Sequence, residues 1–206
     1  ARWSRGLGDV YKRQEKTVVV RPTYMIGPGD RTDRSMHWPV RMNMGGEAIV
    51  PGKFNDAVQY VDIRDIAYWM IRLLENETTG VFNGVGPENK TTLHEYVKEV
   101  HEIFDSKSTL VMIDDYKFLN EHGIFFIVPW VMPTDQHKSS AYANNELSKQ
   151  NGLTFENFKK TITDINDWWN SESLSERREA FMKSEFNLMN REEEVLEAWK
   201  KLKAEE

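Results

Sequence analysis

The feature that most constrains the fold is an apolar run that ends in a proline and a glycine-rich loop. Thr17–Val20 is β-branched throughout, and Arg21-Pro22 and the loop Gly27-Pro28-Gly29-Asp30 follow it. A run without polar alternation is typical of a strand buried on both faces, as in a parallel sheet. Ligands of open α/β sheets bind beyond the carboxyl ends of such strands, so this loop is predicted to face a ligand.

Strand and helix patterns alternate after this run, which predicts an α/β fold. Strands are expected at 48–50, 59–63, 81–85, 110–113 and 124–128, with residues 59–63 half-exposed because polar and apolar residues alternate there. Between 31 and 46 the pattern predicts a short helix that Pro39 interrupts. The clearest helix is expected to begin at Asp65, with an apolar stripe formed by Ile66, Trp69, Met70, Leu73 and Leu74.

The second half of the chain is richer in helix patterns. Thr92 and Glu95 have the spacing of a capping box, and Asp115 is suited to cap a short helix that ends at Gly123. Two further helices are expected at 145–150 and 158–169. The C-terminal tail, residues 171–206, is charged and helical, and its apolar edge, formed by Val195, Trp199 and Leu202, could dock on the domain or on a partner.

Composition excludes several classes of protein and site. The 206 residues contain no cysteine, so disulfides, thiolate metal sites and a cysteine nucleophile are excluded, and a cytoplasmic location fits this count. The formal charge of −6 argues against a nucleic-acid partner. No apolar run approaches the ~20 residues of a membrane span, so no membrane partner is expected. The five histidines lack the spacing of metal ligands, so no metal is predicted.

Residues 1–14 differ from the remaining chain. They carry four basic residues and one acidic residue, and they have neither helix nor strand periodicity. Their string Gly-Leu-Gly-Asp-Val-Tyr-Lys-Arg-Gln resembles a translated sequencing adapter, so we interpret the segment as non-native. A flexible, disordered basic arm is the alternative.

Four later segments have an order and spacing typical of one known family. Arg21–Asp30 is similar to an Arg-Pro…Tyr-Gly-Pro-Gly-Asp loop, and Val58–Ala67 to a strand–helix corner ending in Val-x-Asp-(Leu/Val/Ile)-Ala. Thr79–Gly86 is similar to a Gly-x-(Tyr/Phe)-Asn-x-Gly strand, and Asn144–Leu153 to an Asp-x-x-Lys…Leu-Gly-(Trp/Tyr) segment. Together they resemble the C-terminal half of an extended short-chain dehydrogenase/reductase of the NAD-dependent epimerase/dehydratase family.

The resemblance implies that residues 15–170 form the C-terminal strands of a Rossmann-type parallel sheet and a small mixed α/β substrate-binding lobe. Residues 171–206 would be a helical C-terminal extension, similar to that of a bacterial subgroup. The family's Gly-x-x-Gly-x-x-Gly loop and its catalytic Tyr-x-x-x-Lys pair are not in this sequence. We therefore expect no catalytic residue here and interpret the chain as the C-terminal part of a truncated enzyme. NAD or NADP would be bound mainly by the N-terminal half, and a full-length parent could be a homodimer.

The same resemblance assigns residues to the ligands. Pro22 and Thr23 would lie beside the nicotinamide and contact it through backbone. A small-molecule substrate would contact Tyr24, Met25, Arg31, His37 and Gln59. The alternative for His37 is packing against Trp38, and for Arg31 solvation at the surface. Val58 stands where nucleotide-sugar members have an arginine that pairs with the diphosphate, which argues against a nucleotide-sugar substrate.

The function implied for the parent is hydride transfer between NAD(P) and a small, sugar-like hydroxyl or carbonyl compound by an epimerase, dehydratase or reductase. Two alternative functions are compatible with the same fold but involve no catalysed reaction. One is an RNA-binding member, against which the acidic charge argues. The other is a non-catalytic sensor of a dinucleotide.

Overall fold

The structure is a computed structural model that describes residues 17–134, 137, 139–185 and 187–205, so the interpretation of residues 1–14 lies outside it. The parallel strand pairs are β1 (Val18–Pro22) with β6 (Gly80–Gly84), β2 (Tyr24–Ile26) with β5 (Tyr60–Asp62), and β3 (Gly46–Pro51) with β8 (Ser108–Ile113). The antiparallel pairs are β4 (Ala57–Val58) with β7 (Thr91–Thr92), and β9 (Phe126–Ile127) with β10 (Trp130–Val131). The helices are α2 (His37–Met42), α3 (Ile63–Glu75), α4 (Leu93–Ile103), α5 (Tyr116–Glu121), α6 (Glu146–Gln150), α7 (Phe158–Trp169), α8 (Ser175–Lys183) and α9 (Glu192–Ala204). The part of the chain that the structure describes also contains the 3-10 turns η2 (Arg34–Met36), η3 (Glu172–Leu174) and η4 (Leu188–Asn190). Strands and helices alternate as expected, so the α/β class is confirmed.

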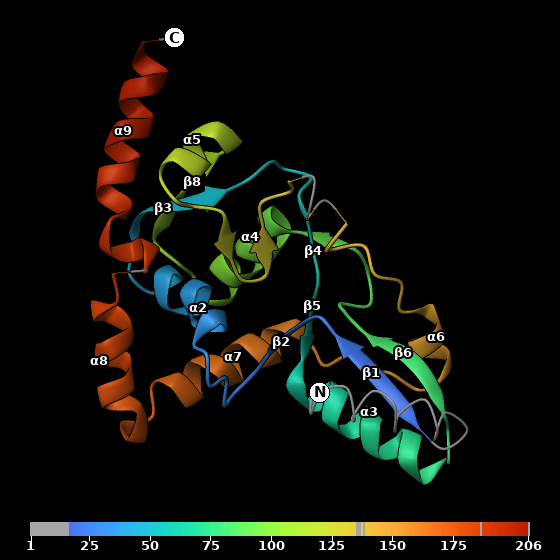
Figure 1. The fold of residues 1–206 in the computed structure, drawn as a ribbon. Coiled ribbons are helices and arrows are strands. Elements are labelled where there is room, and N and C mark those ends of the chain that lie inside the picture. The colour runs from blue at the N-terminus through green and yellow to red at the C-terminus, as the bar shows by residue number, and fades with distance from the viewer. Residues whose placement is uncertain (1–16, 135–136, 138, 186, 206) are drawn as a thin grey trace, which may run out of the picture.

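The described side chains form two apolar cores. The larger core lies around β3 and β8, where α2, α4, α7 and α9 supply its apolar residues, and it includes the fully buried Trp38 and Trp130. The smaller core lies between α3 and the β1–β6 pair, on the right of Figure 1, where the rings of Trp69 and Phe82 meet at 5.8 Å. The chain therefore buries its apolar surface in two places rather than under one continuous sheet.

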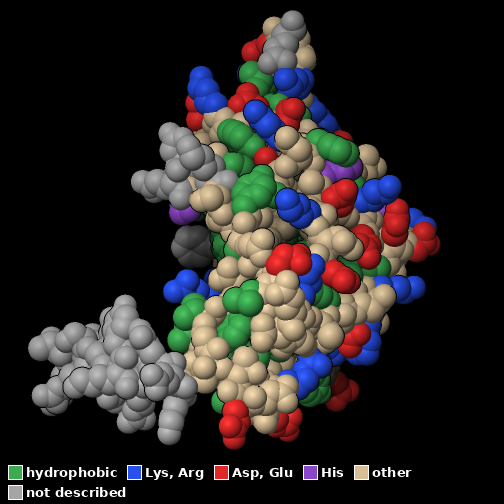
Figure 2. All heavy atoms as spheres, turned by 90° about the vertical axis from the view of Figure 1, so that its right-hand side faces the viewer, with side chains coloured by type: hydrophobic (Ala, Val, Ile, Leu, Met, Phe, Trp, Pro, Cys, Tyr) green, Lys and Arg blue, Asp and Glu red, His purple; other side chains and the backbone are tan. Residues whose placement is uncertain are grey.

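The prediction that the first strand is buried on both faces was wrong. Val18 and Val20 pack against the smaller core, but all three valines of β1 are only partly buried and Arg21 is exposed. Within the described residues β1 pairs with β6 alone, and α3 covers one face of that pair. Val81 of β6 is 48% exposed, and hydrophobic side chains are visible among charged ones on this side of the molecule (Figure 2). An all-apolar strand sequence therefore does not show that other elements cover both faces of the strand.

The strand expected at 59–63 and the helix after it also differ from the prediction. β5 is buried throughout instead of half-exposed, and α3 begins at Ile63 with Asp62 as its N-cap, because the Asp62 carboxylate accepts from Arg64 N. Ile66, Trp69 and Leu73 of the predicted stripe are buried, as expected. The two remaining members, Met70 and Leu74, are 41% and 65% exposed because the β1–β6 pair reaches only part of the helix surface.

Two local predictions around prolines were also wrong. Pro39 does not interrupt a helix, because it lies in the first turn of α2, where a missing N–H breaks no helical hydrogen bond. The strand expected at 124–128 is instead a short hairpin of β9 and β10, joined by a turn through Val128 and Pro129.

The helical expectations for the second half are confirmed. Thr92 and Glu95 form the capping box of α4, and Asp115 caps α5. The tail packs back onto the larger core, where Trp199 of α9 meets the ring of Phe118 at 5.0 Å. The boundary between 15–170 and 171–206 stays a prediction. No helix among the described residues combines the length and apolar character needed to cross a membrane.

Gly52 shows how tightly the end of β3 is packed. Its φ is +91°, and a Cβ at this position would overlap the Asp56 carboxylate and lie 2.8 Å from Nε1 of Trp130. That carboxylate accepts hydrogen bonds from Trp130 Nε1 at 2.8 Å and from the Tyr116 hydroxyl at 2.5 Å. Only glycine combines this backbone conformation with the close approach of the buried carboxylate.

Candidate functional site

An open cleft of about 600 Å³ lies beyond the carboxyl ends of β1, β2 and β5. It begins where Pro22 ends β1, continues along the loop that follows β2, and is closed on one side by Ile63, the first residue of α3. Five of the seven predicted site residues line it, namely Pro22, Thr23, Tyr24, Met25 and Arg31. The position agrees with the rule that ligands of α/β sheets bind at this end of the strands.

The corner between β1 and β2 is fixed by backbone and side-chain contacts. The Thr23 hydroxyl donates to the backbone carbonyl of Gln59 at 3.2 Å, which joins the corner to the residue before β5. Gly27 closes the other end of β2 with a φ of +146°, and a Cβ there would lie 2.7 Å from Cγ2 of Ile63. These two contacts fix the backbone at both ends of β2, where it lines the cleft.

The loop after β2 is organised around the carboxylate of Asp30. One oxygen of Asp30 accepts from Thr32 N at 2.8 Å and from its hydroxyl at 2.6 Å, and the other accepts from Ser35 N at 3.1 Å and from its hydroxyl at 2.8 Å. Burial works to raise the pKa of Asp30, but these hydrogen bonds outweigh it and hold the pKa below its ordinary value. Asp30 is therefore an ionised anchor of the cleft rim.

The tail also holds this rim, through Arg177 of α8. Its guanidinium donates to the Asp30 carbonyl at 2.6 Å and forms two contacts with the Asp33 carboxylate, at 2.7 and 2.9 Å. The same guanidinium lies 5.7 Å from the ring centre of Trp168. Sequence reasoning missed this residue, because nothing in a Glu-Arg-Arg run indicates contact with a loop more than 140 positions away.

Two of the cleft side chains suit polar recognition. Arg31 is exposed and, within the described chain, has no hydrogen-bond or ion-pair partner, so its guanidinium is free to meet an anion. Burial raises the pKa of Tyr24, and the positive charge of Arg34 offsets only part of this rise. The Tyr24 phenol is therefore protonated near neutral pH and can donate a hydrogen bond.

The structure places the two remaining predicted residues elsewhere. His37 lines a neighbouring cavity, where it is buried beside the edge of Trp38 with ring centres 4.9 Å apart. Gln59 lies at a third cavity, and its amide is engaged with Ala143: Nε2 donates to the carbonyl at 2.8 Å and Oε1 accepts from the N–H at 3.1 Å. This clamp holds the 141–145 loop and leaves little of the Gln59 amide for a substrate.

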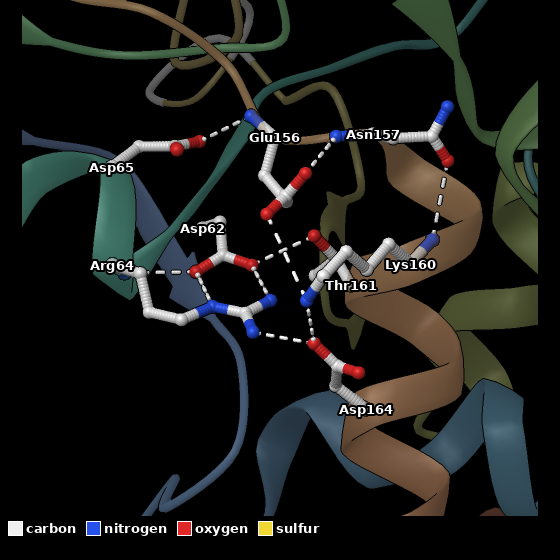
Figure 3. A network of polar contacts seen from close by, with 8 residues as sticks. All are labelled: Asp62, Arg64, Asp65, Glu156, Asn157, Lys160, Thr161 and Asp164. Carbon is white, nitrogen blue, oxygen red and sulfur yellow. Dashed lines mark hydrogen bonds and ion pairs between the residues drawn. The ribbon is translucent and has the colours of Figure 1, made fainter.

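A charged network stands beside the cleft at the start of α3 (Figure 3). The Arg64 guanidinium donates hydrogen bonds to both carboxylate oxygens of Asp62, at 2.9 and 2.6 Å, and also to Asp164 of α7. The Thr161 hydroxyl donates to Asp62 at 2.7 Å. Burial works to raise the pKa of Asp62, but the hydrogen bonds from Arg64 and Thr161 hold it below its ordinary value. The network ties α3 to α7, which agrees with a structural role for Arg64.

Metal binding has no support within the described residues, where no group of three histidine or acidic side chains is arranged to hold an ion. The cleft is large enough for a small organic ligand, because its volume lies within the ~300–1,000 Å³ typical of ligand sites.

Comparison with known proteins identifies the fold. No protein-family model and no curated protein matches the chain. Solved structures do: a UDP-N-acetylglucosamine 4-epimerase from Methanobrevibacter ruminantium M1, in complex with UDP-N-acetylmuramic acid, is 12% identical with a TM-score of 0.56, and the match covers 79% of this chain and 49% of that chain. A UDP-glucose 4-epimerase from Thermotoga maritima, with UDP-glucose, is 18% identical with a TM-score of 0.53, covering 81% and 51%. A UDP-glucuronic acid 4-epimerase mutant from Bacillus cereus, in complex with a UDP-sugar analogue and NAD, is 12% identical with a TM-score of 0.50, covering 74% and 45%.

The chain therefore has the Rossmann-like α/β fold found in these UDP-sugar 4-epimerases, and it spans about half the length of each of the three. The fold expected from the four sequence segments is confirmed. At identities below 20% the likeness extends to the fold alone and does not establish a reaction.

Proposed function

We propose that this chain is the C-terminal part of an NAD(P)-dependent epimerase, dehydratase or reductase, and that the cleft at Pro22–Arg31 forms its substrate wall and one side of its nicotinamide site. The observation that carries the proposal is the gathering of these residues in one open cleft at the carboxyl ends of parallel strands. The bound NAD in one structural neighbour supports the choice of cofactor. The acidic formal charge gives no support to the RNA-binding alternative.

The residues of this chain would bind and orient rather than transfer protons. Pro22 and Thr23 would hold the nicotinamide ring against the β1–β2 corner, and the bound cofactor would accept or return a hydride. Tyr24 would donate a hydrogen bond to a substrate oxygen, Met25 would supply apolar contact, and Arg31 would pair with an anionic substrate group. His37 and Gln59 would shape the walls from outside the cleft. The proposal assigns the catalytic Tyr-x-x-x-Lys pair to sequence upstream of this chain.

Two measurements test the proposal. The native coding sequence upstream of residue 15 is expected to encode a Gly-x-x-Gly-x-x-Gly loop and a Tyr-x-x-x-Lys pair. The purified 206-residue chain is expected to turn over neither UDP-sugars with NAD(P)+ nor simple sugar ketones with NAD(P)H, whereas the longer protein turns over one of these two classes. Turnover by the short chain, or an upstream sequence without either motif, contradicts the proposal.

The site assignment is tested in the longer protein with two exposed arginines. Arg31→Gln removes the free guanidinium of the cleft, and Arg21→Gln is the matched control, because Arg21 is exposed on β1 but does not line the cleft. Loss of a charged hydrogen bond to an anionic substrate should raise KM about tenfold or more. An unchanged KM for Arg31→Gln, or an equal rise for both variants, would remove Arg31 from the site.

A further inference from the structure

Two arginines of the cleft lack an acidic partner. Arg31 and Arg34 both line the cleft, both are exposed, and within the described residues neither forms an ion pair with a carboxylate. We call these two residues the arginine pair. Arg34 Nε donates to the Thr32 hydroxyl at 2.9 Å, which holds the side chain against the loop, and its Nη1 and Nη2 form no hydrogen bond to any described residue. The arginine pair therefore keeps most of its donors for a molecule in the cleft.

The carboxylates next to the arginine pair in sequence are already bound. Asp30 accepts four hydrogen bonds from Thr32 and Ser35, and Asp33 is paired with Arg177. Asp30 is also the one acidic residue among the described residues that line the cleft, so this lining carries a net charge of +1 in a chain whose formal charge is −6. A locally positive cleft attracts anions and raises their concentration at its mouth.

Tyr24 of β2 adds a third donor to the same wall. The positive charge of Arg34 opposes the rise in the pKa of Tyr24 that burial causes, so the phenol lies within electrostatic reach of the guanidinium. Because this phenol is protonated near neutral pH, it can donate a hydrogen bond beside two guanidinium groups that stay charged at every physiological pH. The polar side of the cleft is thus suited to an anion rich in acceptor oxygens.

We propose that the cleft binds a small, sugar-like phosphate monoester and that Arg31 and Arg34 together bind its phosphate. A phosphate monoester places about two negative charges on one phosphorus near neutral pH, which matches two arginines on one short loop. A nucleotide diphosphate distributes its charge over two phosphorus atoms and adds a base, for which the described lining offers only the ring of Tyr24 as a stacking surface. That this ligand is the substrate rests on the proposed function, whereas the anion site rests on the lining residues alone.

NMR titration of the purified 206-residue chain at low ionic strength tests the anion site. Glucose 6-phosphate is the probe, glucose 6-sulfate is the control with a single negative charge, and glucose is the uncharged control. The probe should shift the amide signals of residues 30–34 and the Nε–Hε signals of the arginine pair, with a Kd of about 10 mM or tighter. The sulfate should bind about threefold more weakly because it carries less charge, and glucose should leave these signals in place.

Three single substitutions locate the binding. Arg31→Gln and Arg34→Gln should each weaken binding of glucose 6-phosphate about threefold or more, a modest change because exposed ion pairs are individually weak. Arg21→Gln is the matched control and should leave the Kd unchanged, because Arg21 is exposed on β1 but does not line the cleft. If Arg34→Gln disturbs the loop through the lost bond to Thr32, Arg31→Gln decides, because Arg31 has no hydrogen bond within the described chain to lose.

UDP-glucose tests the class of the phosphoryl group and should bind more weakly than glucose 6-phosphate. The proposal is overturned if glucose 6-phosphate shifts none of these signals at about 20 mM, or if the sulfate binds as tightly as the phosphate. It is also overturned if Arg31→Gln and Arg21→Gln weaken binding equally, or if UDP-glucose binds more tightly than glucose 6-phosphate. Failure of these titrations leaves the proposed function standing, whereas a longer protein that binds the probe but turns over no sugar contradicts the proposed function alone.

Discussion

The buried ion pair between Arg41 and Glu192 offers the sharpest test of how the tail is attached. Glu192 begins α9, and Arg41 Nε lies 2.5 Å from one of its carboxylate oxygens, with both side chains less than 10% exposed. The other oxygen accepts from Ile49 N on β3 at 2.8 Å. Arg41 Nη1 donates to the Gly45 carbonyl and to the Ser108 hydroxyl, and Nη2 donates to the Glu47 carbonyl. Glu192→Ala therefore leaves a buried cation without its counter-ion and a strand N–H without an acceptor.

The cost of this change follows from the burial of both groups. Removing one partner of a buried ion pair costs about 3–5 kcal/mol, and the cost of the unsatisfied N–H is part of the same loss rather than an addition to it. Burial raises the pKa of Glu192 above its ordinary value even though Ile49 N and Arg41 favour the charged form. The attraction within the pair therefore only partly offsets the free energy lost when Glu192 leaves water. Removing one partner should destabilise the fold by more than the intact pair stabilises it. Glu192→Gln keeps an acceptor for Ile49 and should cost less.

Urea denaturation followed by circular dichroism measures the change. Glu192→Ala should lower the free energy of unfolding by about 3–5 kcal/mol, a large part of the ~5–15 kcal/mol of a typical domain. The matched control is Lys200→Ala, which breaks the ion pair of Lys200 with Glu47, also between α9 and β3 but half-exposed, and should cost less than about 1 kcal/mol. A loss below about 1 kcal/mol for Glu192→Ala, or equal losses for both variants, would refute the reasoning.

Burial, opposed by one backbone N–H and reinforced by neighbouring carboxylates, raises the pKa of Asp65 to about 6. A raised carboxyl pKa gives stability that is fully present below the unfolded pKa of about 3.9 and lost as pH rises through about 6. Asp65→Asn should remove this loss and raise the free energy of unfolding at about pH 7.5 by about 1 kcal/mol, since the group is half-exposed; no gain there would contradict the assignment. Gly52→Ala should cost about 3 kcal/mol or more, whereas Gly152→Ala, with a similar φ of +87° and open space, should cost about 1 kcal/mol; equal melting temperatures would contradict this. Arg177→Ala should increase amide hydrogen exchange across residues 30–36, and unchanged exchange would show that the tail does not hold the rim.

Short-range patterns carried most of the correct fold predictions. The capping box of Thr92 and the buried stripe of Ile66, Trp69 and Leu73 depend on residues within one helix, so the sequence alone reveals them. The burial of individual side chains could not be predicted from these short-range patterns. Whether Val19 is covered, or Met70 exposed, depends on which other elements reach those surfaces, and that is decided by distant parts of the chain.

The site residues show the same contrast between short-range and long-range contacts. Residues 22–31 could be predicted to share a cleft because they lie in one short stretch that turns at the end of a strand. Gln59 could not be placed in this way, since its amide is engaged with Ala143, which is distant in sequence. For His37 the sequence left two interpretations open, and the structure has the ring packed against its neighbour Trp38. Arg177 is the clearest omission, because its partners lie at the opposite end of the chain.

The contact of Arg177 with the loop at residues 30–33 makes the last helices part of the geometry of the cleft. A change in the tail could therefore shift the rim of the cleft without any substitution in the residues that line it. Fusion partners, affinity tags or deletions introduced after residue 170 should accordingly be designed to preserve α8, because its loss would remove the Arg177 contacts to the loop at residues 30–33.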